Sequence, residues 1–231
     1  MTAIDGVPGG DLPVQVAGET LLLMPERVAA WPARRTLLVA DAHFGKAASF
    51  RALGVPVPAG TTEDNLAGLD AAVARAAPER IVFLGDFLHS RLGRAPDTLD
   101  ALHAWRARHA GVAMVVVRGN HDRHAGDPPP GLGIDVVDEP LRDSPFLLCH
   151  HPREREGGYV LAGHLHPAIR LRGRGRDRLT LRCFHFAPSL GVLPAFGAFT
   201  GRALIEPAAE DRVFVITGAE VLRIPACPAG T

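Results

Sequence analysis

The sequence predicts an α/β fold in which two sheets pack face to face and helices lie outside them. In the first half, apolar strand-like segments alternate with helix-like segments, which is typical of βαβ units. In the second half, short apolar segments follow one another, with tight turns between several of them. The chain has no internal repeat, and we expect residues 1–231 to form one domain.

Three strands and two helices are expected in the first half. The first helix begins at about Thr62, with Thr61 as its N-cap, and Pro78 ends it. The second helix begins at Pro96 and ends near Gly111. Apolar strand segments precede, separate and follow these helices at residues 35–40, 81–84 and 112–117.

The second half begins with an expected loop, because the run Asp127-Pro128-Pro129-Pro130-Gly131 cannot form regular structure. Short strands are expected after this loop. They lie at residues 146–149, 159–162, 169–172, 179–184, 203–205 and 213–216.

The composition argues against several classes of protein. The formal net charge is zero, so a surface that binds a polyanion must be local. The 3 cysteines are widely spaced, which suits reduced thiols in a cytosol better than a disulfide framework or a zinc site. The sequence has no signal-peptide pattern and no apolar run of the ~20 residues that span a bilayer. We therefore expect a cytoplasmic protein that does not enter a membrane.

Five clusters of polar residues stand beside apolar segments. Four of them directly follow a strand, and the C-terminal ends of strands are where open α/β sheets bind ligands. The fifth closes a strand near the middle of the chain. The clusters are Asp41-x-His43, Gly85-Asp86-x-x-His89, Gly119-Asn120-His121-Asp122, His150-His151-Pro152 and Gly163-His164-Leu165-His166.

Each cluster alone is more often a helix cap or a hydrogen-bonded structural element than a metal site. Together they supply carboxylate, imidazole and amide donors, a mixed nitrogen and oxygen set that suits Mn, Fe or Zn. The glycines before Asp86, Asn120 and His164 permit sharp turns that bring backbone and side chain close to an ion. The ordered combination therefore predicts a metal site.

The five clusters resemble the signature of the calcineurin-like metallophosphoesterases, and the similarity runs over most of the chain. This resemblance implies a four-layer α/β-β/α sandwich of two mixed sheets with flanking helices. Longer stretches are similar to one branch, the bacterial ligase-associated DNA damage response endonucleases. These stretches are residues 41–46 (DAHFGK), 54–58 (GVPVP), 105–109 (WRARH), 118–123 (RGNHDR), 162–167 (AGHLHP) and 193–201 (LPAFGAFTG).

The resemblance also implies two divalent metal ions, with Mn expected and Fe or Zn as alternatives. Each ion has three ligands of its own and one that both share. The implied ligands are Asp41, His43 and His166 for one ion, Asn120, His150 and His164 for the other, and Asp86 as the bridge. Of the two adjacent histidines, His150 is taken as the ligand because it directly follows the strand, and His151 is expected in the outer shell.

Two ions about 3.5 to 4 Å apart can hold a hydroxide that attacks phosphorus in line. The side chain of His121 diverges from that of Asn120, so it can face the substrate and protonate the leaving oxygen. Asp122 is expected to fix the tautomer of His121. Without the other clusters, this pair would instead be read as a hydrogen-bonded turn. The predicted activity is therefore that of a metal-dependent phosphodiesterase.

Four further residues are candidates for substrate contacts. Lys46 is the one lysine of the chain and is either a cation placed for phosphate or a chance residue. It does not belong to a P-loop, because no Ser or Thr follows it. Arg118 and Arg123 flank the catalytic cluster and are expected to hold the scissile phosphate. His89 stands where many members of the superfamily have Asp or Asn, so either an outer-shell role or a substrate contact is expected.

The substrate is less constrained by the sequence. The segment Arg170–Arg182 holds six arginines, and it is either a strip that tracks nucleic acid or a solvated turn in an arginine-rich chain. Aromatic residues make up 6%, which argues against an extended base-stacking platform. The resemblance implies a DNA endonuclease in DNA repair, with a DNA ligase and a repair helicase and exonuclease as partners.

Two alternatives stay open. One is a hydrolase of small phosphoesters, such as cyclic nucleotides, nucleotide conjugates or phosphomonoesters. The other is a non-catalytic binding module, which predicts lost ligands, although every expected ligand position is filled.

Overall fold

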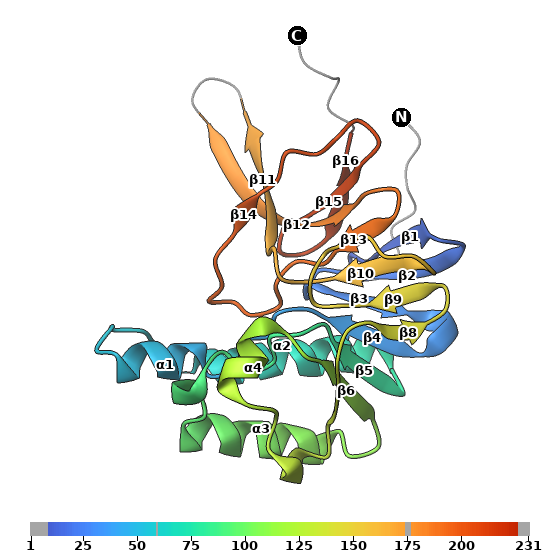
Figure 1. Ribbon diagram of the computed structural model, residues 1–231. Helices are drawn as coiled ribbons and strands as arrows, with labels where there is room; N and C mark the ends of the chain where they lie inside the picture. The colour runs from blue at the N-terminus through green and yellow to red at the C-terminus, as the bar shows by residue number, and fades with distance from the viewer. Residues whose placement is uncertain (1–8, 59, 174–176, 226–231) are drawn as a thin grey trace.

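The computed structural model describes residues 9–58, 60–173 and 177–225. Two mixed sheets lie face to face, and helices flank the first of them (Figure 1). This arrangement confirms the predicted α/β fold of two mixed sheets with flanking helices. In the described part of the chain no helix follows Leu132, so the second helical layer of the expected sandwich is not present there.

The first sheet combines an antiparallel half with a parallel half. Its first four strands form an antiparallel meander, and its last four strands run parallel. In spatial order the strands are β1 (Leu12–Val16), β2 (Glu19–Met24), β3 (Val28–Trp31), β4 (Thr36–Val39), β5 (Arg80–Phe83), β6 (Ala113–Val117) and β7 (Asp135–Val137). The parallel half matches the strands predicted at residues 35–40, 81–84 and 112–117.

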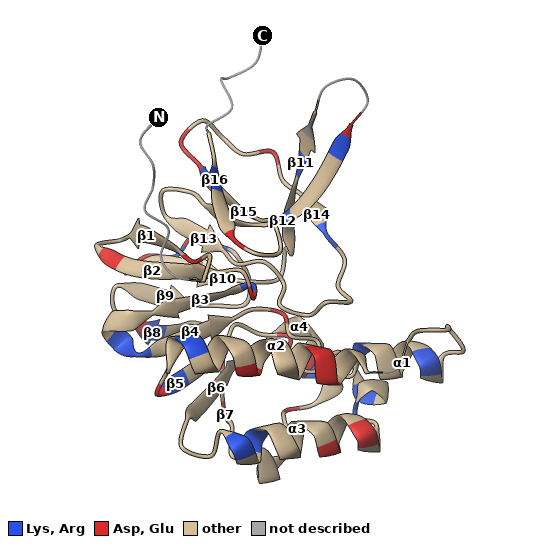
Figure 2. Cartoon of the chain, turned by 180° about the vertical axis from the view of Figure 1, so that it is seen from behind, with Lys and Arg blue, Asp and Glu red and all other residues tan. Residues whose placement is uncertain are grey.

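The helices of the first half lie between these parallel strands in the sequence. They are α1 (Lys46–Ala52), α2 (Thr61–Ala76), α3 (Pro96–Arg108) and α4 (Asn120–Ala125), with short 3₁₀ turns η1 (Pro32–Arg34), η2 (Arg91–Gly93) and η3 (Pro130–Leu132). Apolar side chains at helical spacing on α2 and α3 pack against the outer face of the sheet. Charged residues lie on the solvent sides of these two helices (Figure 2).

The start of α2 differs from the prediction that Thr61 is its N-cap. Thr61 is the first helical residue, and Gly60 takes the cap position with a left-handed backbone (φ 84°). The Thr61 hydroxyl donates to the Pro58 carbonyl. A glycine cap without a side-chain bond is easily overlooked when Ser, Thr and Asp are the expected caps.

The second sheet contains nine strands and also mixes parallel and antiparallel pairs. The parallel trio β9, β10 and β13 brings the ends of β9 and β10 to the same edge. The strands are β8 (Leu141–Asp143), β9 (Phe146–Leu148), β10 (Tyr159–Ala162), β11 (Pro167–Arg172), β12 (Arg178–Phe186), β13 (Leu190–Val192), β14 (Ala203–Leu204), β15 (Arg212–Ile216) and β16 (Val221–Ile224).

The six short strands predicted in the second half are all found, as β9, β10, β11, β12, β14 and β15. Several elements were not predicted, among them the N-terminal meander β1 to β3, the short helices α1 and α4 and the strands β7, β8, β13 and β16. The run 127–131, expected to be irregular, contains the start of η3. None of the helices in the described residues combines the length and apolar character needed to cross a membrane.

The core between the two sheets is built from the inward faces of both. Phe146 from β9 is fully buried there and packs edge-on against Trp31 from β3, with ring centroids 4.8 Å apart. Aromatic pairs in this geometry stabilise a core beyond the area they bury. The contact fixes the second sheet on the first, and so fixes the relative position of the strand ends.

Truncation of this contact tests the packing of the two sheets. We expect Phe146→Ala to lower the free energy of unfolding by about 3 to 5 kcal/mol, because it removes a buried ring and leaves a cavity. The control Leu222→Ala changes a residue that is 43% exposed. Its effect should stay within about 0.5 kcal/mol. Urea unfolding measures both, and equal losses for the two variants would contradict a shared core.

Candidate metal centre

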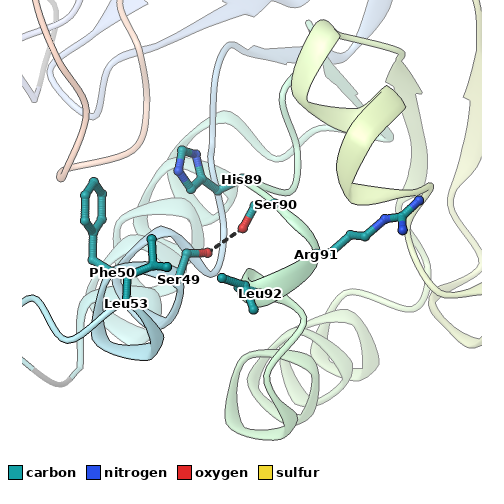
Figure 3. Close-up of a pocket in the computed structure, with 7 residues that line it drawn as sticks. All are labelled: Ser49, Phe50, Leu53, His89, Ser90, Arg91 and Leu92. Carbon is teal, nitrogen blue, oxygen red and sulfur yellow. Dashed lines mark hydrogen bonds between the residues drawn. The ribbon is translucent and has the colours of Figure 1, made fainter.

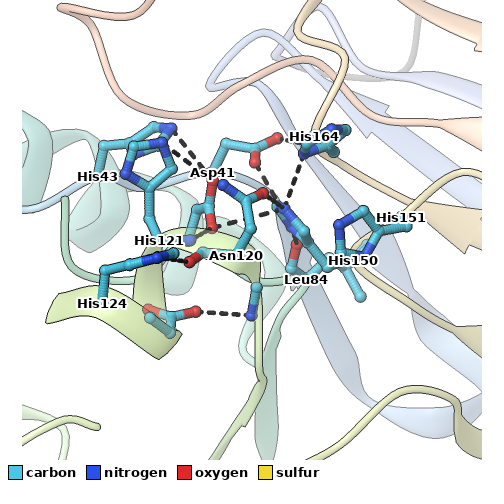
Figure 4. A network of polar contacts seen from close by, with 12 residues as sticks. Asp41, His43, Leu84, Asn120, His121, His124, His150, His151 and His164 are labelled. Carbon is cyan, nitrogen blue, oxygen red and sulfur yellow. Dashed lines mark hydrogen bonds and ion pairs between the residues drawn. The ribbon is translucent and has the colours of Figure 1, made fainter. Parts of the chain in front are cut away.

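The predicted ligands converge where the two sheets meet (Figure 4). From the first sheet, Asp41 and His43 follow β4, Asp86 follows β5, and Asn120 begins α4 after β6. The remaining histidines come from the second sheet. They are His150, which follows β9, and His164 and His166, which follow β10. Parallel strands end at one edge of a sheet, which explains why residues so distant in the sequence come together.

Five of these residues have a left-handed backbone, which is uncommon outside glycine. The φ angles are 51° at Asp41, 47° at His43, 51° at Asp86, 70° at His164 and 51° at His166. Such conformations cost of order 1 kcal/mol or more each and persist where the surroundings hold them. Hydrogen bonds between the two strand ends provide part of that support, since His43 N–H donates to the Asp86 carbonyl at 2.9 Å.

Three glycines leave room for the buried side chains of the site. A Cβ on Gly85 would lie 2.2 Å from Nδ1 of His150. A Cβ on Gly119 would lie 2.3 Å from Oδ1 of Asp86, and a Cβ on Gly163 would lie 2.6 Å from Oδ2 of Asp41. The sequence analysis assigned these glycines to sharp turns, but only Gly85 of the three has a positive φ (79°). Close approach is therefore their shared role.

The first group of ligand atoms comprises Asp41, His43 and His166. Nε2 of His43 lies 3.4 Å from Nε2 of His166. Nε2 of His166 also lies 3.6 Å from Oδ1 of Asp41. The structure thus brings together the three residues that the resemblance assigned to one ion.

The second group comprises Asn120, His150 and His164. Nδ1 of His150 is 3.0 Å from the Leu84 carbonyl, and because a carbonyl can only accept, this nitrogen carries the proton. Nε2 of His150 is therefore an acceptor, yet it lies 2.9 Å from another acceptor, Oδ1 of Asn120. Nδ1 of His164 is 3.0 Å from the same nitrogen. A cation among these atoms would satisfy all three.

Asp86 lies between the two groups. Its Oδ2 is 3.7 Å from Nε2 of His43 in the first group. Its Oδ1 is 3.5 Å from Nε2 of His150 in the second group. One carboxylate thus presents one oxygen to each half of the site, as a bridging ligand requires.

The electrostatics of the site fit a pair of cations. Asp41 and Asp86 are both buried, and Oδ1 of Asp41 has no hydrogen-bond partner among the described residues. Burial raises the pKa of Asp86, and the neighbouring charge of Asp41 raises that pKa further. Burial lowers the pKa of His43, so its ring is neutral and offers a lone pair. Two buried carboxylates beside imidazoles whose pKa burial lowers are stabilised by positive charge, which divalent ions would supply.

His121 stands beside the two groups, and 37% of its side chain is exposed. Its Nδ1 donates to the His89 carbonyl at 2.7 Å, which leaves Nε2 on the side of Asp86, 4.0 Å from Oδ2. The prediction that Asp122 fixes this tautomer is wrong. The Asp122 carboxylate accepts from the backbone N–H groups of Gly119 (2.9 Å) and Leu88 (3.2 Å), because it closes the first turn of α4.

Two further histidines lie close enough to the proposed ligands to hold a metal ion with them, His89 with His43 and His121, and His151 with His150 and His164. Nδ1 of His151 is 3.0 Å from Oε1 of Glu139, whose other oxygen accepts from the backbone N–H groups of His150 and His151. The ring of His89 stacks on that of His121, and burial followed by the charge of Lys46 lowers the pKa of His89 to about 4. Glu139 was not predicted, because it lies in the segment between β7 and β8, where the sequence contains no recognisable motif.

The cations predicted to hold the substrate divide into two kinds. Lys46 begins α1 beside the site, where burial lowers its pKa while the charges of Asp86 and Asp41 act in the opposite direction. Arg118 is already held by Asp127 at 3.0 Å and Asp138 at 2.7 Å. Both ends of its guanidinium are therefore paired, with carboxylates that are 48% and 68% exposed, and its predicted role as phosphate holder stays a prediction.

Arg123, the other arginine predicted to hold the phosphate, has a looser environment. It lies 3.8 Å from Asp138, and 58% of its side chain is exposed. The role of phosphate holder stays a prediction for Arg123.

A pocket of about 290 Å³ adjoins the site on the side of α1 (Figure 3). Phe50 and His89 stand on one wall, and Leu53 and Leu92 on another. The hydroxyls of Ser49 and Ser90 are 2.7 Å apart and join α1 to η2. Of these residues only His89 was predicted, as an outer-shell residue or a substrate contact. The pocket gives the site an apolar neighbour that can hold an organic part of a phosphoester.

Comparisons with known proteins agree with this geometry. Residues 34–166 match the family model described as calcineurin-like phosphoesterase. The crystal structure of the Pseudomonas putida nuclease MPE is 45% identical, covers 93% of this chain and 100% of that chain, and has a TM-score of 0.83. The structure of Yfce, a phosphoesterase from E. coli, is 15% identical in sequence, and the match covers 83% of this chain and 99% of that chain with a TM-score of 0.39. No curated protein gives a significant match.

The family match spans more than half of the chain and contains every predicted ligand from Asp41 to His166. The similarity to the nuclease is consistent with the endonuclease branch that the sequence resembles. The chain therefore belongs to the calcineurin-like phosphoesterases and is a metal-dependent phosphoesterase.

Proposed function

We propose that the chain is a two-metal phosphodiesterase that cuts DNA internally and acts in DNA repair. The observation that carries the two-metal part is the position of Asp86, whose two oxygens face the two ligand groups. The proposed ligands are those of the resemblance: Asp41, His43 and His166 for one ion, Asn120, His150 and His164 for the other, and Asp86 for both. Mn is the proposed metal from the family resemblance, and the donor set, which mixes nitrogen with oxygen and contains no thiolate, suits Mn as it suits Fe or Zn.

When bound, two such ions supply a nucleophile at neutral pH and offset the charge that develops at phosphorus. The residues of the chain do the rest. The Leu84 carbonyl accepts a hydrogen bond from the ring of His150 and so orients it. The Glu139 carboxylate accepts from the backbone N–H groups of residues 150–151 and holds this segment in place. Lys46 contributes positive charge next to the carboxylates.

His121 is the proposed general acid. The His89 carbonyl holds the proton of Nδ1, so the proton on Nε2 of the cationic ring is the one that can be given away. That nitrogen faces the region of Asp86, where the phosphate must bind to reach both ions. The proton would go to the ester oxygen as its bond to phosphorus breaks.

DNA as the substrate is supported by the similarity to the Pseudomonas putida nuclease over nearly the whole chain. The apolar pocket beside the site can hold a nucleoside part of such a substrate. A DNA ligase and a repair helicase and exonuclease are proposed partners, and a cytoplasmic location is proposed, from the family resemblance and the sequence.

The metal content of variants tests the two ligand groups. The purified chain should hold two Mn ions, and His166→Gln should hold about one, because it removes a ligand from one group only. His185→Gln is the control, since His185 lies on β12 and pairs there with Asp211, which precedes β15. Elemental analysis after dialysis against limiting Mn gives the counts. If His166→Gln kept both ions at unchanged affinity, the assignment would be wrong.

Cleavage of a closed circular single strand tests the nuclease activity. With Mn the circle should be converted to linear and shorter products, because only an endonuclease can begin on a strand without ends. Asp86→Asn should abolish the reaction. Should the chain hydrolyse bis(p-nitrophenyl) phosphate while leaving every DNA intact, the proposal of a nuclease would fail in favour of a small-ester hydrolase.

The role of His121 predicts a dependence on the leaving group. His121→Ala should slow DNA cleavage by about 10² to 10⁴-fold, the usual contribution of a general acid. The same variant should lose much less activity on bis(p-nitrophenyl) phosphate, since p-nitrophenolate leaves without a proton. His103→Ala, at an exposed position of α3, is the control. Equal losses on both substrates, with metal content retained, would argue against an acid.

A further inference from the structure

Three arginines gather around a cavity on the far side of the loop that follows β13. The cavity has a volume of about 410 Å³ and is lined by Arg27, Arg182 and Arg202 together with Thr180 and Thr217. Arg27 comes from the turn between β2 and β3, Arg182 from β12, and Arg202 from the residues before β14. None of the three belongs to the ligand groups.

These guanidinium groups have no acidic partner. In the described ranges none of them forms an ion pair with a carboxylate, and Nε of Arg27 is buried without a hydrogen-bond partner. Arg202 donates to the Thr180 carbonyl at 3.2 Å. Burial, followed by the charges of Arg27 and Arg202, lowers the pKa of Arg182 to about 10. Like charges held together in a polar cavity are stabilised by an anion.

Arg182 has a different task from the other two. Its guanidinium donates to Oγ1 of Thr200 at 2.8 Å and to the carbonyl of Ala198 at 3.1 Å, and only 9% of the residue is exposed. It therefore holds the loop in place. Arg27, which lies over the ring of Phe196, and Arg202 are the arginines whose donors remain for a ligand.

The loop connects this cavity to the metal centre. On one side, Gly197 N–H donates to the carbonyl of Asp41 at 3.1 Å. A second cavity, of about 320 Å³, is lined by Lys46, Thr200 and Gly201 on that side. Gly201 directly precedes Arg202, so consecutive residues of one segment line two cavities that each contain a cationic side chain. The charge of Arg182 also acts on the pKa of Lys46, in keeping with their proximity.

We propose that Arg27 and Arg202 bind a backbone phosphate of the DNA strand, remote from the phosphate that is cut. Arginine presents a planar fork of donors that matches phosphate oxygens, and such contacts position a strand without reading its sequence. The strand would run from the metal centre past Lys46 and across the loop at residues 200–202. This inference rests on the proposed nuclease function and adds to it a second phosphate subsite.

The salt dependence of DNA cleavage tests the subsite. In the double variant Arg27→Gln, Arg202→Gln, the KM for DNA should rise, and the slope of log KM against log salt should become shallower by about 1 for each lost phosphate contact. Hydrolysis of bis(p-nitrophenyl) phosphate, which has a single phosphate, should be unchanged. The variant Arg202→Lys, which keeps the charge, should retain most of the slope.

Arg35→Gln is the matched control, because it removes the same charge at the opposite end of β4, where Arg35 pairs with Glu79. Its slope should equal that of the unaltered chain. An unchanged slope in the double variant would overturn the subsite, and so would a parallel loss of small-ester hydrolysis, which indicates damage to the fold.

Thermal unfolding with inorganic phosphate distinguishes a cavity that binds a free phosphate ion from one that binds a phosphate of a DNA strand. If phosphate stabilised the unaltered chain but not the double variant, and the DNA slope stayed the same, the cavity would bind a free anion and the proposal would be wrong. If the unaltered chain did not cut DNA at all, the nuclease function itself would fail before the variants were compared.

Discussion

The burial of two carboxylates, Asp41 and Asp86, at the junction of the two sheets is the constraint on which the site depends. Removing a carboxylate from water costs far more than the fold can absorb unless positive charge or hydrogen bonds replace the water. Burial lowers the pKa of the nearby His43, and one oxygen of Asp41 has no partner in the described residues. The left-handed backbone at five positions and the glycines that leave room for these side chains are consistent with a centre held in place for cations.

The same geometry suits the proposed separation of metal binding from proton transfer. The side chain of Asn120 lies beside His150, whereas that of its neighbour His121 is 37% exposed, with Nε2 4.0 Å from Oδ2 of Asp86. The His121 ring donates its Nδ1 proton to the carbonyl of His89, and this hydrogen bond fixes the orientation of the ring. Outside the centre, the loop after β13 is bonded on one side to Asp41 and on the other to Arg182, and thereby ties the metal site to a surface suited to phosphate.

Much of this could be predicted from the sequence. The polar residues that follow the strands could be identified from motifs, and the structure brings Asp41, His43 and His166 together, and likewise Asn120, His150 and His164. Contacts made by distant segments could not be predicted. Arg118 looked free in the sequence, but Asp127 and Asp138 reach it from a loop and from the residue after β7. Glu139 and the cavity of three arginines carry no motif, because their members come from separate strands and turns.

The central claim is that Asp86 bridges two divalent ions, and anomalous diffraction from crystals grown with Mn tests it most directly. The account predicts two peaks about 3.5 to 4 Å apart. One should lie among Asp41, His43 and His166 and the other among Asn120, His150 and His164, with one oxygen of Asp86 on each. A single peak, or peaks centred on His89 or His151 with Asp86 unliganded, would contradict it.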